Sequence, residues 1–143
     1  MRYWDTSALL PILIDEPGTK LSRAWLEEDG EICTWGMTHV EMASAIERRA
    51  REGRLTAGQR TRALREAELL VSHAHEVTDA LAVRKRATLI LARHSLRAGD
   101  AAQLASALLI ADPEPGSLSF VCLDRRLGDA ASREGMPVLG WPE

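Results

Sequence analysis

Two kinds of hydrophobic pattern alternate along this chain: short apolar runs, and longer segments whose apolar residues recur every three or four positions. The short runs predict strands and the periodic segments predict helices. Strands are expected over residues 2–4, 31–34, 75–77, 119–123 and 137–139. Helices are expected over residues 7–14, 19–28, 38–52, 56–70, 79–94, a strongly apolar segment after Gly99, and 125–134.

Short strands that alternate with helices are typical of a parallel sheet with helices on both faces. The sequence therefore predicts an α/β fold. No internal repeat, low-complexity tract or linker divides the 143 residues, so we expect one domain over residues 1–143.

The composition is that of an ordinary globular protein, with 45% hydrophobic and 27% charged residues. No apolar run is long enough to span a bilayer, and acids interrupt the N-terminal apolar stretch that a signal peptide requires. We therefore expect a cytoplasmic protein that does not associate with a membrane. The two cysteines, Cys33 and Cys122, lack the spacing of a zinc site and are expected to be free thiols.

The net charge of −3 does not by itself indicate a nucleic-acid-binding protein. The middle of the chain is nevertheless basic, and arginines are well suited to holding phosphates. A solvated helix face is the alternative interpretation of such a run, and the sequence leaves both open. These arginines are Arg48, Arg49, Arg51, Arg54, Arg60, Arg62 and Arg65. Arg125 and Arg126 follow an acid directly and are further candidates.

Four acids occupy corresponding places in this pattern. Asp5 and Asp124 each follow a predicted strand, whereas Glu41 and Asp100 lie in the first turn of a predicted helix. The carboxyl ends of parallel strands share one edge of a sheet, where such folds bind ligands. We therefore expect the four carboxylates to meet at that edge.

Each acid also has a simpler explanation. Asp5 and Asp124 suit helix N-caps, Glu41 suits a capping box with Thr38, and Asp100 suits the positive end of a helix dipole. Together, however, carboxylates within a few ångströms repel one another, and a divalent cation relieves that repulsion. Oxygen ligands alone favour Mg²⁺ or Mn²⁺.

Four segments of the chain resemble PIN-domain ribonucleases, in the right order and spacing. They are Trp4-Asp5-Thr6-Ser7-Ala8-Leu9, Thr38-x-x-Glu41 with the apolar run after it, residues 97–107 around Asp100, and residues 120–127 around Asp124. The size and single-domain build resemble the VapC-type toxins of toxin–antitoxin pairs.

This resemblance implies a three-layer α/β/α sandwich with a four- or five-stranded parallel sheet. It implies an endoribonuclease that depends on Mg²⁺ or Mn²⁺, with Asp5, Glu41 and Asp100 as metal-binding acids and Asp124 as the fourth, more variable one. Many relatives carry Ser or Thr where this chain has Cys122. The implied partners are the RNA substrate, a VapB-type antitoxin and a second copy in a homodimer. The helices over residues 19–28 and 38–52 are the expected walls of the antitoxin groove.

Other interpretations are weaker. A non-catalytic PIN-fold scaffold would be expected to lose some of the acids, and this chain keeps all four. A receiver-type domain needs a lysine near its acids, but Lys20 and Lys85 lie away from the predicted strand ends. Nucleotide-binding glycine motifs are absent. His73 and His75 are more typical of a surface segment than of a metal site. Thr6 or Ser7 is expected to support the turn around Asp5.

Overall fold

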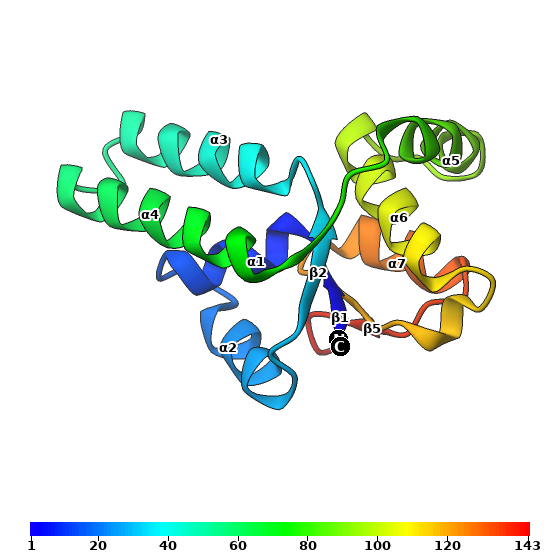
Figure 1. Ribbon diagram of the computed structural model, residues 1–143. Coiled ribbons are helices and arrows are strands. Elements are labelled where there is room, and N and C mark those ends of the chain that lie inside the picture. The colour runs from blue at the N-terminus through cyan, green and yellow to red at the C-terminus, as the bar shows by residue number, and fades with distance from the viewer.

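A five-stranded parallel sheet forms the centre of the computed structural model, which describes residues 1–143 (Figure 1). The strand order is β3-β2-β1-β4-β5, and every neighbouring pair is parallel. The strands are β1 (Arg2–Trp4), β2 (Ile32–Trp35), β3 (His75–Val77), β4 (Phe120–Val121) and β5 (Val138–Leu139). This is the five-stranded form of the expected sheet.

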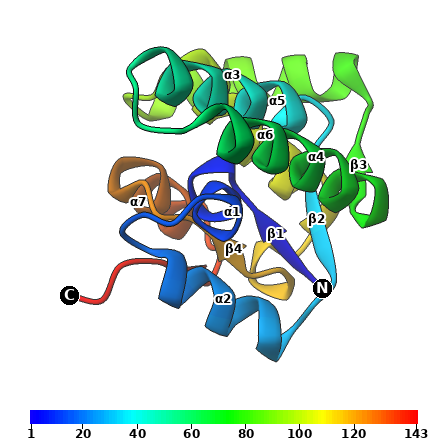
Figure 2. The same cartoon turned by 90° about the vertical axis from the view of Figure 1, so that its left-hand side faces the viewer.

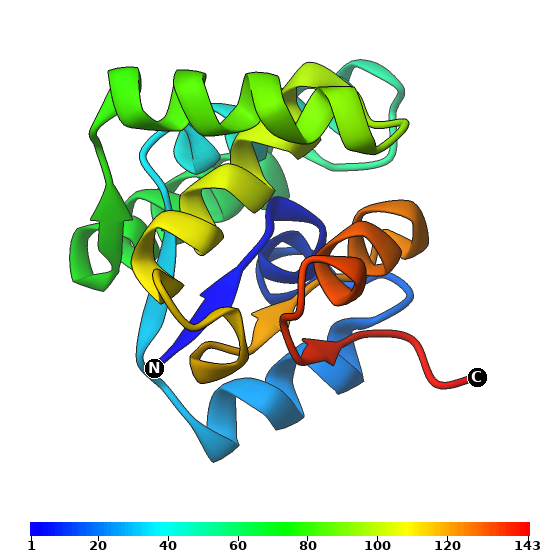
Figure 3. The ribbon, with the colours of Figure 1, turned by 90° about the vertical axis from the view of Figure 1, so that its right-hand side faces the viewer.

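Helices cover both faces of the sheet. One layer holds α1 (Thr6–Leu13), α2 (Thr19–Glu28), α3 (Thr38–Arg51) and α4 (Ala57–His73), seen from its own side in Figure 2. The other layer holds α5 (Ala80–Arg93), α6 (Ala98–Ala111) and α7 (Arg125–Arg133), seen in Figure 3. A short 3₁₀ helix, η1 (Pro115–Ser117), precedes β4. The predicted three-layer α/β/α sandwich is therefore confirmed.

The central strands β1 and β4 are apolar because both of their faces are buried. Along β1, the side chain of Tyr3 belongs to the core beneath α5–α7, whereas that of Trp4 belongs to the core beneath α1, α3 and α4. Residues of β4 divide in the same way, with Phe120 on one face and Val121 on the other. The rings of Tyr3 and Phe120 stack with centroids 5.4 Å apart. Two apolar cores thus fix the sheet between the helix layers.

The strand predicted over residues 119–123 is shorter in the structure, where only Phe120 and Val121 are assigned to β4. Beyond them, the backbone N–H of Leu123 donates to Oγ of Ser7 rather than to a neighbouring strand. The chain leaves the sheet there and turns into α7. No helix combines the length and apolar character needed to cross a membrane.

The order in which strands are added to the sheet reverses direction at β1. The chain first adds β2 and β3 on one side of β1, and then returns to add β4 and β5 on the other. In such sheets a crevice forms outside the carboxyl ends of the strands at this switch point. Here the switch lies between β1 and β4, the strands followed by Asp5 and Asp124.

Candidate active site

The structure brings the four acids to one cavity at the carboxyl edge of the sheet. Asp5 follows β1, and Asp124 is the N-cap residue of α7. Glu41 and Asp100 lie in the first turns of α3 and α6. All four line a cavity of about 480 Å³. Segments almost 120 residues apart in the sequence therefore contribute to one site.

Asp5 is the most buried of the acids, with 4% of its surface exposed. Its Oδ2 accepts hydrogen bonds from the backbone N–H of Ser7 at 3.0 Å and from the Ser7 hydroxyl at 2.6 Å. The same hydroxyl accepts a bond from the Leu123 N–H at 2.9 Å, so it ties the end of β4 to the site. The Cys122 thiol lies 3.7 Å from Oδ2. Ser7 thus supports the turn around Asp5, as expected.

Glu41 belongs to a buried hydrogen-bond network rather than to a helix cap. Its Oε1 accepts bonds from the Thr6 hydroxyl at 2.7 Å and from Nε2 of Gln103 at 2.6 Å. The Gln103 amide also donates to Thr38 Oγ1 at 3.0 Å, and its Oε1 accepts from the Tyr3 hydroxyl at 2.6 Å. The capping-box interpretation of Thr38 and Glu41 is therefore wrong, since both side chains point toward Gln103.

Asp124 and Asp100 differ in how their side chains are held. Oδ1 of Asp124 accepts the Leu127 N–H at 3.0 Å, so this residue caps α7 while it lines the cavity. Asp100 is half-buried and accepts no hydrogen bond from the chain. Gly99, directly before it, leaves room for Glu41: a Cβ at that position would lie only 3.0 Å from Glu41 Oε2.

The proximity of the acids changes their proton affinities. Burial raises the pKa of Asp5 to about 6; the Ser7 hydrogen bonds act against this rise, and the charges of Glu41 and Asp100 add to it. Burial also raises the pKa of Asp100, as do the charges of Asp124 and Glu41, while Arg97 and Arg126 oppose the rise. The cavity therefore holds more negative charge than its surroundings compensate.

The donor chemistry fits a divalent cation with an open coordination sphere. No group of three or more His, Cys, Asp or Glu side chains is arranged so that it could hold a metal ion. Each acid of the cavity nevertheless keeps at least one oxygen free of hydrogen bonds from the chain: Asp5 Oδ1, Glu41 Oε2, Asp124 Oδ2 and both oxygens of Asp100. Mg²⁺ is commonly bound by one or two carboxylates together with water and phosphate. The residues present suit that mode.

The arginines expected to hold phosphates fall into two groups. Arg48 lines the acid cavity and has no acidic partner, so it is available to a ligand. Arg49 is not available to a ligand, because its guanidinium is held 3.1 Å from the carboxylate of Glu16 in a largely buried pair. Arg97 and Arg126 border a neighbouring cavity that shares Glu41, Asp100 and Asp124 with the first. Arg97 carried no signal in the sequence beyond its closeness to Asp100.

Gln103 is the functional residue that sequence analysis missed. It is fully buried in α6, among alanines and leucines, and contacts Glu41 and Thr6 directly. A single long polar side chain within an otherwise apolar helix was the available signal, because a buried amide requires partners. His73 and His75 are exposed residues that do not line the acid cavity, consistent with their interpretation as part of a surface segment.

Comparisons with known proteins agree with this architecture. The family model of the PIN domain matches residues 2–131, which include all four acids. The chain belongs to the PIN domain family. Two relatives from Mycobacterium tuberculosis, Ribonuclease VapC45 from strain CDC 1551 / Oshkosh and Ribonuclease VapC49 from strain ATCC 25618 / H37Rv, are each 30% identical over 136 residues. Each alignment covers 95% of this PIN domain chain and 92% of the relative.

Solved structures share the PIN fold at lower sequence identity. FitAcB from Neisseria gonorrhoeae has a TM-score of 0.65 at 18% identity, and a toxin–antitoxin complex from Klebsiella pneumoniae has 0.62 at 14%. Each comparison covers 97% of this chain and 96% of the other. The arrangement of sheet and helices is therefore that of PIN-domain structures over nearly the whole length.

Proposed function

We propose that this PIN domain is a metal-dependent endoribonuclease and the toxin of a VapBC-type toxin–antitoxin pair. The observation that carries the proposal is the convergence of Asp5, Glu41, Asp100 and Asp124 on one cavity, each with a carboxylate oxygen left free. Relatives named as VapC ribonucleases, aligned over 95% of the chain, support the same activity. The metal is Mg²⁺ or Mn²⁺ on the chemistry of its oxygen donors.

The acidic side chains of the cavity have different roles in binding the cation and the attacking water. Asp5 and Asp100, whose pKa values are raised by burial and by the charges of neighbouring acids, are the primary cation ligands, because a cation compensates negative charge that the protein leaves uncompensated. Glu41, fixed by Thr6 and Gln103, presents its free oxygen to the same ion or to the attacking water. A bound divalent cation supplies Lewis acidity, neutralising phosphate charge and activating water.

No covalent nucleophile is required for this chemistry. The Ser7 hydroxyl is engaged on both sides, donating to Asp5 and accepting from the Leu123 N–H, and no histidine lies beside it. Its role is to orient the Asp5 carboxylate. Arg48 and Arg126 border the acid-lined cavities and carry positive charge toward the phosphates that enter there.

The proposed antitoxin has a suitable surface on this chain. A mostly apolar cavity of about 440 Å³ opens between α1, α2 and α4, where Leu13, Leu26 and Leu69 contribute side chains. Exposed apolar grooves of this kind receive the apolar face of a partner helix. Of the two helices expected as walls of the antitoxin groove, α2 lines this cavity and α3 does not. A homodimer stays a prediction, with exposed apolar side chains such as Val40 and Leu81 available on α3 and α5.

Cleavage of a labelled RNA by the purified chain tests the proposal. We expect cleavage with Mg²⁺ or Mn²⁺, loss of cleavage with EDTA, and a decrease of at least about 100-fold in the variants Asp5→Asn and Asp100→Asn. Asp15→Asn is the matched control, because Asp15 is exposed and lies outside the acid cavity.

Two results would contradict the proposal. Equal cleavage by wild type, Asp5→Asn and Asp100→Asn would indicate a contaminating nuclease. No cleavage of any RNA by correctly folded wild type with either metal would favour the non-catalytic scaffold instead. Far-UV circular dichroism of each variant verifies that a lost activity is not a lost fold.

A further inference from the structure

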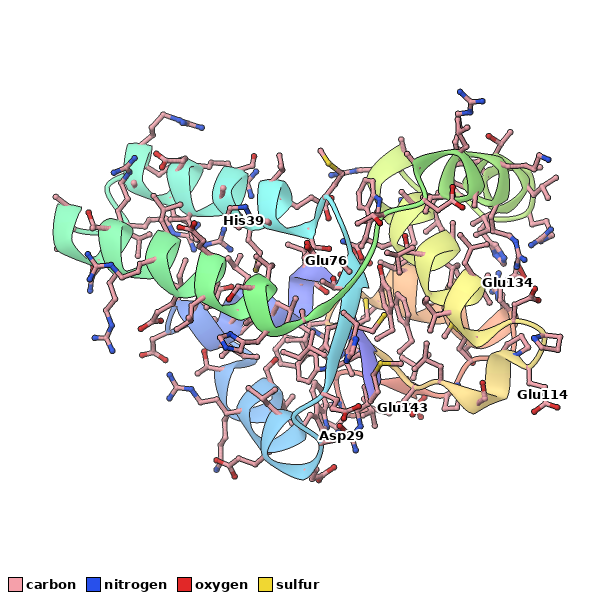
Figure 4. All side chains as sticks on the ribbon, viewed as in Figure 1. Asp29, His39, Glu76, Glu114, Glu134 and Glu143 are labelled. Carbon is pink, nitrogen blue, oxygen red and sulfur yellow. The ribbon has the colours of Figure 1, made fainter.

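A second polar cavity lies beside the acid cluster, and of its lining residues only Arg126 has a role in the chemistry above. It has a volume of about 290 Å³ and opens between the end of α5, the segment before α6, and α7. Its lining is predominantly basic, with Arg93, His94, Arg126 and Arg133 on its walls and Asp129 as the one acid. Figure 4 labels Glu134 on this side of the molecule, at the end of α7.

The basic side chains of this cavity are only partly neutralised. Arg93 forms an ion pair with Glu134 and is thereby held in place on the cavity wall. Arg126 and Arg133 are exposed and have no acidic partner within the chain. A pocket with two unpaired guanidinium groups attracts an anion, and guanidinium geometry suits phosphate oxygens in particular.

His94 provides an independent indication of a ligand. Its side chain is 10% exposed, and its buried Nε2 makes no hydrogen bond within the chain. Oε1 of Glu134 lies 3.6 Å from Nε2, beyond hydrogen-bond distance. A buried ring nitrogen left without a hydrogen-bond partner at the wall of a basic pocket is available to a bound oxyanion.

Arg126 connects this cavity to the acid cluster. It lines the basic cavity together with Arg133, and it also lines the cavity formed by Glu41, Asp100 and Asp124. Its charge opposes the rise that burial and the neighbouring acids cause in the pKa of Asp100. Arg126 therefore places the basic cavity directly beside the acid cluster.

We propose that the cavity between the end of α5, the segment before α6, and α7 is a phosphate subsite that holds the RNA backbone beside the cleaved bond, an inference that rests on the proposed ribonuclease function. Arg133 and Arg126 contact the phosphate oxygens, His94 lies beneath them, and Arg93 is positioned by Glu134. Contacts of this kind fix the register of the strand without reading its sequence. Free inorganic phosphate offers the same chemistry, and the experiment separates the two.

Fluorescence anisotropy with a labelled single-stranded RNA of random sequence, in EDTA so that no cleavage occurs, measures the subsite directly. We expect Arg133→Ala to weaken binding about tenfold, the equivalent of one charge-assisted hydrogen bond. We expect it also to reduce the slope of log affinity against log salt by about 0.7, the value for one phosphate contact on a single strand. His94→Gln should weaken binding in the same direction. Asp129→Asn should strengthen it, because it removes the one negative charge of the cavity.

Arg65→Ala is the matched control, since Arg65 is an exposed and unpaired arginine on α4, outside both cavities. Arg133 and Asp129 make no side-chain hydrogen bond or ion pair, so these variants should fold as wild type does, which thermal melting verifies. In cleavage assays, Arg133→Ala should raise KM and leave kcat nearly unchanged, as expected for a group that binds ground state and transition state alike.

The failures are distinguishable. If wild type binds RNA and Arg133→Ala matches both wild type and Arg65→Ala in affinity and salt slope, the subsite is overturned while the ribonuclease function stands. If calorimetric titration shows inorganic phosphate binding that Arg133→Ala abolishes, with RNA affinity unchanged, the cavity holds a free anion and the inference is again overturned. If wild type neither binds nor cleaves RNA, the proposed function itself fails.

Discussion

At the scale of single residues, Asp5 holds the central place because it is the only buried carboxylate of the protein. An ionised acid in such surroundings lowers stability unless it is compensated. Two hydrogen bonds from Ser7 compensate it in part, while the neighbouring charges of Glu41 and Asp100 act in the opposite direction. The residue therefore couples folding to proton binding.

This coupling predicts how stability depends on pH in the metal-free protein. The pKa of Asp5 in the folded state, about 6, lies above its ordinary value of 3.8, so the folded chain binds this proton more tightly than the unfolded chain. The associated stability is present at low pH and is lost as pH rises from about 4 to 6, by roughly 3 kcal/mol in total. Urea unfolding of wild type and Asp5→Asn in EDTA, from pH 4 to 8, measures it.

Asp5→Asn should keep the Ser7 hydrogen bonds through its amide oxygen and should remove this pH dependence. The free energy of unfolding of the variant minus that of wild type should therefore increase as pH rises through the same window. Asp15→Asn, at an exposed position, should run parallel to wild type. A constant difference between Asp5→Asn and wild type from pH 4 to 8 would show that Asp5 titrates normally.

At the scale of secondary-structure elements, α7 begins with a residue that has two roles. Asp124 caps the helix through Oδ1, and its other oxygen is free at the cavity. The first turn of a helix has backbone N–H groups without partners inside the helix. The Asp124 side chain accepts a hydrogen bond from one of them and also contributes negative charge to the site. The same holds for Asp5 at the start of α1.

Two substitutions of Asp124 should separate these roles. Asparagine caps a helix as well as aspartate does, so Asp124→Asn should retain stability and lose only the negative charge. Asp124→Ala should lose both, at about 1 kcal/mol in the free energy of unfolding. Cleavage rates and urea unfolding of the two variants provide the comparison. Equal stability of both variants would mean that the cap contributes nothing to α7.

At the scale of the whole molecule, the sheet assembles the site. Asp5 and Asp124 are adjacent because β1 pairs with β4, although 118 residues separate these acids in the sequence. Glu41 and Asp100 come from α3 and α6, which lie in different helix layers (Figures 2 and 3). The cavity is therefore complete only when both layers are packed on the sheet, and a cation bound there would join them.

Divalent cations should consequently stabilise the folded chain. A cation that binds only the folded state at 100 times its Kd contributes about 2.7 kcal/mol, which corresponds to roughly 5–10 °C in Tm for a domain of this size. Differential scanning fluorimetry at pH 7.5 with and without Mn²⁺ measures the effect. The increase should disappear in Asp100→Asn and persist in Asp15→Asn; an equal increase in both would place the cation elsewhere.

The arginines and the hydrogen-bond network show where prediction from the sequence ended. Arg48 and Arg49 are adjacent and both line the cavity, yet Arg49 is paired with Glu16 whereas Arg48 has no acidic partner. Glu41 fitted a helix-capping pattern with Thr38, but it bonds to Thr6 and Gln103 from other segments. A local sequence pattern does not show which residues of distant segments become hydrogen-bond or ion-pair partners. The roles of these residues therefore follow only from the folded structure.

By itself, the sequence determined the order and type of the elements, the parallel sheet between two helix layers, and the four acids at the starts of helices. These follow from periodicity and capping, which are local and therefore visible along the chain. Only the tertiary structure decided which oxygens are free, which arginines are unpaired, and that Gln103 holds Glu41. Burial, charge compensation and hydrogen bonding between distant residues depend on distances that exist only once the chain has folded.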